Sequence, residues 1–246
     1  MLLKIKALIA KIIVNDFTGK VITTLFSNKI PFHNLTINIS NPIIRKRIGA
    51  SLYFKTYESA EVRFISKYLQ NFDGNIVEFG ASIGVVSSTL AKANPKAKLF
   101  SFEADSRFIP IITNNFKINK IDNANCFNEI IGASGYEFIP GKDNTMGKIS
   151  KSDVVSNSMN SLSTILEKYK IQEYVLVSDI EGAEYFVLSE NESVFENCPM
   201  LIMELHPIQI EDKLISVEDL KVRIQELGYS IVEQYGSNVV AKRKKQ

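Results

Sequence analysis

The chain has 246 residues, of which 45% are hydrophobic and 23% are charged, as in ordinary globular proteins. A chain of this length buries a large core without disulfides, so we expect Cys126 and Cys198 to be buried thiols in a reducing compartment. A net charge of +2 gives no general affinity for nucleic acid.

The first 14 residues are strongly apolar but contain three lysines, so they are too short and too charged to span a bilayer. Apolar residues recur at helical spacing over 2–12, which predicts a helix. This helix would pack on its own domain or on a second subunit, as in a homodimer, with peripheral membrane contact as the alternative. Residues 57–68 also have a helical pattern, and we assign 1–74 to an N-terminal helical extension.

From residue 75 onward, short apolar strands alternate with amphipathic helices. Strands are predicted at 76–79, 98–102, 125–131, 174–178 and 200–203, helices at 85–93, 106–118, 162–169, 183–188 and 217–227, and a terminal hairpin from 229–234 and 239–241. This order predicts an α/β domain over 75–246, with a mostly parallel, seven-stranded, doubly wound sheet and a C-terminal antiparallel hairpin strand.

Two stretches between the third predicted strand and the next helix are less regular. Residues 136–139 are predicted to form a small hairpin arm. The polar stretch 141–160 has little periodicity and is predicted to be a long loop. Such a loop is either a plain surface connection or a lid that contributes to binding.

A turn with two glycines follows the first predicted strand, in the pattern Glu78-x-Gly80-x-x-x-Gly84. Glycine lets the backbone approach a ligand and adopt angles that a side chain would forbid. Nineteen residues after Gly84, the second strand ends at Glu103, whose carboxylate can accept hydrogen bonds from both hydroxyls of a ribose. The turn lacks the G-x-G-x-x-G pattern of dinucleotide sites, because Ser82 stands at its second position.

Acidic and imidazole groups also follow the fourth and fifth strands. The fourth strand is followed by the block D-x-E-G-A-E at 179–184, and the fifth by Glu204 and His206. Ligands bind beyond the carboxyl ends of the strands in a doubly wound sheet, so these groups are expected at one site. Glu184 has the simpler interpretation of a first-turn helix acid. Crowded carboxylates need a positive or hydrogen-bonding partner, such as a cationic cofactor or a divalent cation.

These segments resemble the FkbM family of S-adenosylmethionine-dependent methyltransferases over about residues 75–207. The resemblance rests on 78–84, 102–105, 115–119 and 203–206, and above all on the D-x-E-G-A-E block. Two residues depart from the family pattern, since Glu78 stands where aspartate is commoner and Ser82 where asparagine is frequent. The resemblance implies a Rossmann-like class I methyltransferase fold and methyl transfer from S-adenosylmethionine to oxygen, with sugar and polyketide hydroxyls among the family's substrates.

The resemblance also implies roles for individual residues. The expected cofactor-binding residues are Glu78, Gly80, Ala81, Ser82, Gly84, Glu103, Ala104, Asn128, Glu129 and Asp179. Within this set, Glu103 would bind the ribose, and Asn128 with Glu129 would flank the adenine.

The expected catalytic residues are His206, Asp179 and Glu181. His206 is the first candidate for the base, because the ordinary pKa of histidine, near 6.5, suits proton transfer at neutral pH. Asp179 is the second candidate and could instead orient the acceptor. Asp179, Glu181, Glu204 and His206 could assemble a magnesium site, but we expect a metal-free enzyme.

The sequence therefore predicts a cytoplasmic O-methyltransferase that acts on a small molecule or a glycan. Abundant Lys, Asn and Ile indicate a bacterium with an AT-rich genome, for which a sugar of a surface glycan is a reasonable acceptor. The alternatives are a non-sugar acceptor, a scaffold without activity, or a nicotinamide-dependent oxidoreductase. The oxidoreductase is disfavoured by the glycine spacing and by the lack of a Tyr-x-x-x-Lys pair. A nucleic-acid methyltransferase is disfavoured because no Asn/Asp-Pro-Pro-aromatic motif follows the fourth strand.

Overall fold

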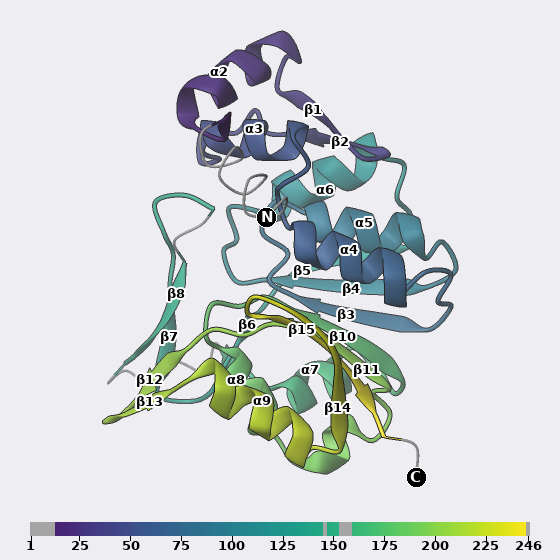
Figure 1. Ribbon diagram of the computed structural model, residues 1–246, viewed down its shortest axis with the longest axis vertical. Helices are drawn as coiled ribbons and strands as arrows, with labels where there is room; N and C mark the ends of the chain where they lie inside the picture. Colours follow the sequence, from purple (N-terminus) through teal and green to yellow (C-terminus); the bar gives the residue numbers. More distant parts are fainter. Residues whose placement is uncertain (1–12, 145–146, 153–158, 245–246) are drawn as a thin grey trace, which may run out of the picture.

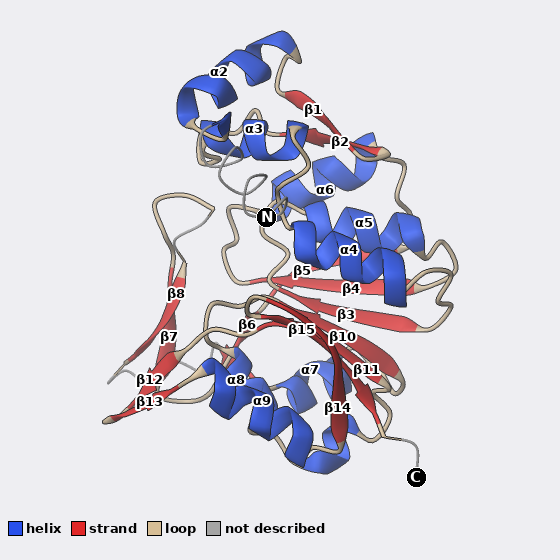
Figure 2. Cartoon of the chain, in the orientation of Figure 1, coloured by secondary structure: helices blue, strands red, loops and turns tan. Residues whose placement is uncertain are grey.

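A seven-stranded sheet forms the centre of the protein (Figures 1 and 2). The computed structural model describes residues 13–144, 147–152 and 159–244, so the helix predicted over 2–12 lies outside the described residues. The strand order is β14-β15-β11-β10-β3-β4-β5. The strands are β3 (Asn75–Phe79), β4 (Lys98–Glu103), β5 (Ala124–Asn128), β10 (Tyr174–Ser178), β11 (Met200–Glu204), β14 (Tyr229–Tyr235) and β15 (Asn238–Arg243).

The pairing confirms the predicted mostly parallel sheet. The five strands from β11 to β5 run parallel, and β15 runs antiparallel to both β11 and β14. All five residues of β10 are buried, as expected of a central parallel strand that is covered on both faces. The fold is thus the predicted Rossmann-like α/β architecture.

Helices cover both faces of the sheet (Figure 1). One face carries α4 (Ser59–Tyr68), α5 (Val85–Ala93) and α6 (Ile109–Ile118), and the other carries α7 (Leu162–Lys168), α8 (Glu184–Leu188) and α9 (Val217–Glu226). Apolar residues of α4 and α5 pack with the strands in one cluster, and those of α7, α8 and α9 pack in another on the opposite face. The apolar residues of α6 belong to a third cluster, which they share with the N-terminal extension. No described helix combines the length and the apolar character needed to cross a membrane.

The N-terminal extension contains a β-hairpin as well as helices. Its described elements before α4 are α2 (Asp16–Leu25), β1 (Lys29–Phe32), β2 (Leu35–Asn38) and α3 (Lys46–Tyr53). Asn115 of α6 and Asn119, which caps the end of this helix, attach the hairpin to the domain. The Thr36 amide donates to Asn119 Oδ1, and the Asn38 amide donates to Asn115 Oδ1, both at 2.8 Å. The extension is therefore not purely helical, whereas the boundary at residue 74 stays a prediction.

The third strand is shorter than predicted, because β5 ends at Asn128. The Asn128 side chain turns back and donates to the carbonyls of Glu103 and Ala104, at 2.8 and 2.9 Å. Glu129 leaves the sheet and accepts hydrogen bonds from Lys168 at 2.5 Å and Tyr169 at 2.7 Å. Ile130–Ile131 then forms a separate strand, β6.

The stretch predicted as a long loop contains two strands. β7 (Tyr136–Ile139) pairs with β8 (Lys148–Lys151) in antiparallel orientation. This pairing confirms the predicted hairpin arm and identifies β8 as its second strand. β9 (Met159–Asn160) pairs with β6 in parallel. A second small hairpin, β12 (Ile208–Ile210) with β13 (Lys213–Ile215), was not predicted, nor was the short 3-10 helix Glu192–Phe195.

Both cysteines are free thiols. Cys198 is fully buried, as predicted, and burial raises its pKa to about 11. Cys126 on β5 is half-buried, because this strand forms the edge of the sheet. The prediction of two buried thiols is therefore right for Cys198 and wrong for Cys126.

Candidate active site

The turn between β3 and α5 requires glycine at its first position. Gly80 has a φ of +88°, in the left-handed region that favours glycine. A Cβ added to Gly80 would lie 1.8 Å from the carbonyl oxygen of Asp179, at the end of the adjacent β10. The backbones at the ends of β3 and β10 are therefore in close contact. Because Gly80 has no side chain, the turn forms a backbone-lined cradle at this residue.

Glu103 links the end of β4 to the same turn. Its Oε2 accepts a hydrogen bond from the Ser82 amide at 2.7 Å, and its Oε1 accepts one from the Asp105 amide at 2.8 Å. Burial raises the pKa of Glu103 to about 7. Each carboxylate oxygen has a second lone pair, so Glu103 can hold the turn and still accept a ligand hydroxyl.

Glu78 on β3 is almost completely buried beneath the turn. Its Oε2 accepts a hydrogen bond from the Ser101 hydroxyl at 2.5 Å, whereas its Oε1 has no hydrogen-bond partner among the described residues. Burial raises the pKa of Glu78 to about 7. Glu78 lines the cavity beside the glycine cradle. A carboxylate at this place fits a ligand that brings donors, and S-adenosylmethionine has an ammonium group and two ribose hydroxyls.

One cavity connects most of the predicted site residues. Its lining includes Glu78, Gly80, Ala81, Ser82, Glu103, Ala104, Glu129, Asp179 and Glu181. Three predicted residues are not part of this lining: Gly84, Asn128 and His206. Gly84 instead allows α5 to pack on α6, since a Cβ there would lie 3.2 Å from Ile112. Asn128 holds the loop after β4 through the hydrogen bonds described above.

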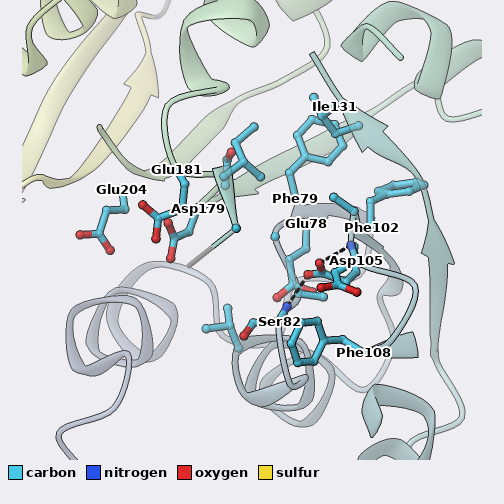
Figure 3. A pocket seen from close by; sticks show the side chains of 18 of the residues that line it. Glu78, Phe79, Ser82, Phe102, Asp105, Phe108, Ile131, Asp179, Glu181 and Glu204 are labelled. Carbon is cyan, nitrogen blue, oxygen red and sulfur yellow. Dashed lines mark hydrogen bonds between the residues drawn. The ribbon is translucent and has the colours of Figure 1, made fainter. Parts of the chain in front are cut away.

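Acidic side chains form the other end of the cavity. Figure 3 shows Asp179, Glu181 and Glu204 on one side of the pocket and Glu78, Ser82 and Asp105 on the other. The Asp179 side chain is 33% exposed, and Glu181 is 57% exposed. Burial raises the pKa of Asp179 well above its ordinary value, and the charges of Glu58 and Glu204 add to this effect.

His206 lies directly beside these acids. Its Nδ1 is 3.4 Å from Glu184 Oε1 and 3.9 Å from Asp179 Oδ1, and its Nε2 is 3.7 Å from Glu181 Oε2. Burial alone would lower the pKa of His206, but the hydrogen bond to Glu184 and the surrounding negative charges raise it to about 9. At neutral pH the imidazole is therefore protonated, unlike the histidine of ordinary pKa that we expected.

Glu184 has a structural role in the D-x-E-G-A-E block. It is fully buried, and its carboxylate accepts hydrogen bonds from the Ile180 amide at 2.7 Å and the Gly182 amide at 2.8 Å. Glu184 also stands in the first turn of α8, as its sequence position indicated. It holds the turn in which Glu181 and Gly182 have positive φ, and so positions Asp179 and Glu181 at the cavity.

Sequence reasoning missed several side chains of the cavity. From the N-terminal extension, Tyr57, Glu58 and Glu61 line it. Phe108 and the β7–β8 hairpin, including Phe138 and Ile149, also contribute. A signal for the acids was present, because Glu58 and Glu61 stand close together at the start of the helical pattern over 57–68. They were not predicted as site residues because they are far in sequence from the strand ends.

The strand order, the glycine turn and the acidic strand ends define a cofactor-dependent methyltransferase of the Rossmann-like class I type. The family model described as the methyltransferase FkbM domain matches residues 78–231. The chain belongs to this family, and its cofactor is S-adenosylmethionine. The family resemblance is thus confirmed, and the alternative of a nicotinamide-dependent oxidoreductase is set aside.

Several solved methyltransferase structures have a similar fold. Precorrin-6y C5,15-methyltransferase from Geobacter metallireducens is 10% identical, with a TM-score of 0.44 over 77% of this chain and 88% of its own. Magnesium protoporphyrin IX methyltransferase from Synechocystis, solved with its cofactor bound, is 11% identical, with a TM-score of 0.45 over 83% and 85%. A ribosomal protein L11 methylase from Lactobacillus delbrueckii is 10% identical, with a TM-score of 0.46 over 77% and 80%. No curated protein matches the sequence.

Proposed function

We propose that the protein transfers the methyl group of S-adenosylmethionine to a hydroxyl oxygen of a sugar, in a bacterial surface glycan or a related metabolite. The observation that carries this proposal is the cavity itself, which joins the glycine turn to the carboxylates of Asp179, Glu181 and Glu204. One end suits a nucleoside cofactor, and the other suits an acceptor that donates hydrogen bonds and loses a proton.

The cofactor end is assigned residue by residue. Gly80, Ala81 and Ser82 would hold the methionine and ribose portions, and Glu103 would accept hydrogen bonds from the ribose hydroxyls. Ala104 and Glu129 line the cavity where the adenine is expected. When bound, S-adenosylmethionine supplies a methyl group already activated by a positively charged sulfur. The task of the protein is then to align the acceptor and to receive its proton.

Asp179 is our first candidate to receive that proton. It lines the cavity next to Gly80, where its carboxylate can accept a proton from an acceptor hydroxyl. His206 holds a proton below its pKa of about 9, so it could act as the base only in alkaline solution. At neutral pH its positive charge instead balances Asp179 and Glu181. Glu181, which is more exposed, would orient the acceptor.

The charge of the acceptor end favours a sugar over a phosphate-rich substrate. Carboxylates accept hydrogen bonds from hydroxyl groups, whereas they repel phosphates. We therefore propose a polyhydroxylated acceptor and no nucleic acid. The free thiols fit a cytoplasmic enzyme. A homodimer or a contact of residues 1–12 with a membrane stays a prediction.

The experiment is a transfer reaction with methyl-labelled S-adenosylmethionine and a panel of free sugars, sugar nucleotides, polyketide alcohols and amines. We expect the label on a sugar oxygen, located by mass spectrometry and NMR. The Asp179→Asn variant should lose most of the transfer rate while it still binds S-adenosylhomocysteine. The exposed Glu218→Gln variant, on α9, is the control. Label on a nitrogen or on a non-sugar alcohol would contradict the proposed acceptor.

A further inference from the structure

Four carboxylates from three separate parts of the chain converge at the acceptor end of the cavity. Glu58 and Glu61 come from the start of α4, Asp179 follows β10, and Glu204 ends β11. One oxygen of each lies within 4.8 Å of the corresponding oxygens of the other three. We propose that these four residues bind one hard divalent cation, Mg²⁺ or Mn²⁺, beside the bound cofactor. This proposal replaces the metal-free enzyme that the sequence led us to expect.

An unpaired buried oxygen indicates that the cluster takes a ligand. Glu61 is 5% exposed, and its Oε1 has no hydrogen-bond partner among the described residues. Asp179 Oδ1 likewise accepts no hydrogen bond from the described part of the chain. Buried polar atoms are nearly always paired, and a buried carboxylate is costly unless a cation or donors face it. The fold therefore places unsatisfied oxygens where a ligand can satisfy them.

The described protein supplies little positive charge to this cluster. His206 is the one cationic side chain that the described residues place within 4 Å, at 3.9 Å from both Asp179 Oδ1 and Glu204 Oε1. The cluster therefore carries an excess of negative charge that a bound cation would offset.

The oxygen spacing fits a single ion. Two oxygens bound to the same ion lie at most about 4.2 Å apart for Mg²⁺ and about 5 Å apart for Ca²⁺. The four oxygens of the cluster lie within 4.8 Å of one another, so a small inward movement of the side chains would bring them to the spacing of one ion. All four candidate ligand atoms are carboxylate oxygens and none is a sulfur, so the site favours hard cations. The neighbouring group of Asp179, Glu184 and His206 is a poorer site, because both Glu184 oxygens already accept backbone hydrogen bonds.

The inference rests on the proposed function and adds to it the means of activating the acceptor. A divalent cation lowers the pKa of a coordinated hydroxyl, so a sugar hydroxyl bound to it would lose its proton more readily to a neighbouring carboxylate. The ammonium group of the cofactor is the competing occupant. It carries one positive charge against four carboxylates, so the divalent ion neutralises the cluster better.

The test measures Mn²⁺ binding to the full chain without cofactor, by the loss of the free-ion signal in electron paramagnetic resonance. We expect one saturable site in the wild type, and Mg²⁺ should compete for it. Glu61→Gln keeps the shape of the side chain but removes its charge, and it should weaken Mn²⁺ binding at least about tenfold. Glu181→Gln is the matched control, because this nearby acid lies outside the four and should change binding less than about threefold.

A parallel titration with S-adenosylhomocysteine separates the two proposals. If that ligand binds but Mn²⁺ does not, the metal site is wrong and the methyltransferase proposal stands. If Glu61→Gln and Glu181→Gln weaken Mn²⁺ binding equally, the ion senses only general negative charge, and the specific site is refuted. A Glu61→Gln variant that binds Mn²⁺ as the wild type does also refutes it. Thermal unfolding without metal verifies that each variant is folded.

Discussion

The close contact between Gly80 and β10 can be tested against a second glycine in the same backbone conformation. Gly80 and Gly135 have φ angles of +88° and +84°. A Cβ on Gly80 would lie 1.8 Å from Asp179 O, whereas a Cβ on Gly135 would have no described atom within 4 Å. Replacing each glycine by alanine therefore introduces the same backbone strain, but only the Gly80→Ala change adds a steric clash.

The expected magnitudes follow from these two terms. Left-handed strain in alanine costs about 1–2 kcal/mol, which is the full expected loss of unfolding free energy for Gly135→Ala. Overpacking against the backbone adds about 1–3 kcal/mol, so Gly80→Ala should lose about 2–5 kcal/mol. Urea unfolding of the chain without cofactor measures both losses, and the linear extrapolation compares them directly.

The same pair of variants also tests the site. Displacing β3 from β10 changes the shape of the cofactor cradle, so Gly80→Ala should weaken S-adenosylhomocysteine binding at least about tenfold, or about 1.4 kcal/mol. Gly135→Ala should leave the dissociation constant unchanged, because Gly135 is not part of the cavity lining. Equal unfolding losses for the two variants would refute the contact. Unchanged binding in Gly80→Ala would refute the role of the turn.

Three further predictions concern single side chains. The pKa of Glu78 rises from 4.5 to about 7 on folding, so its stabilising contribution is complete below pH 4.5 and is lost as the pH rises through 7. Glu78→Gln should therefore reduce the fall in unfolding free energy between pH 4 and 8 by about 3 kcal/mol. A variant whose stability falls with pH as steeply as that of the wild type would contradict this prediction. Glu103→Ala should weaken S-adenosylhomocysteine binding about tenfold or more by calorimetry, and an unaltered dissociation constant would remove the ribose role. Asn115→Ala removes the acceptor of the Asn38 amide and the donor to Ile83 O. It should therefore lower the unfolding free energy measured in urea by about 2–3 kcal/mol. A loss below about 0.5 kcal/mol would show that α6 does not hold the hairpin in place.

The elements that the sequence predicted well are those with a strong local pattern. The central strand β10 is uninterrupted apolar sequence, and the helix over 217–226 begins at a capping box in which Ser216 and Asp219 bond each other's backbone amides. The glycine turn and the strand-end acids could be placed because a doubly wound sheet has a known binding edge. These features predicted the fold and most of the residues on one side of the cavity, whereas the cofactor followed from the family resemblance.

Some of the missed elements had a local signal in the sequence, and others depend on contacts between distant segments. The hairpin of β1 and β2 had a local signal, since buried and more exposed residues alternate on both sides of a two-residue turn at 33–34. The sequence predicted Ile130–Ile131 as the end of the third strand, whereas these residues form the separate strand β6. Its partner β9 had no local signal, because two residues give no periodic pattern. His206 was located correctly at the end of β11, but its pKa depends on Glu184 and Asp179, whose distance from it no sequence pattern gives.

The most direct test of the whole account is a crystal of the protein grown with S-adenosylhomocysteine. We predict that the nucleoside occupies the cavity between the Gly80 turn and Glu103, with a ribose hydroxyl on the Glu103 carboxylate and the sulfur facing Asp179. A ligand bound outside this cavity, with protein side chains filling the space between the Gly80 turn and Glu103, would contradict the account.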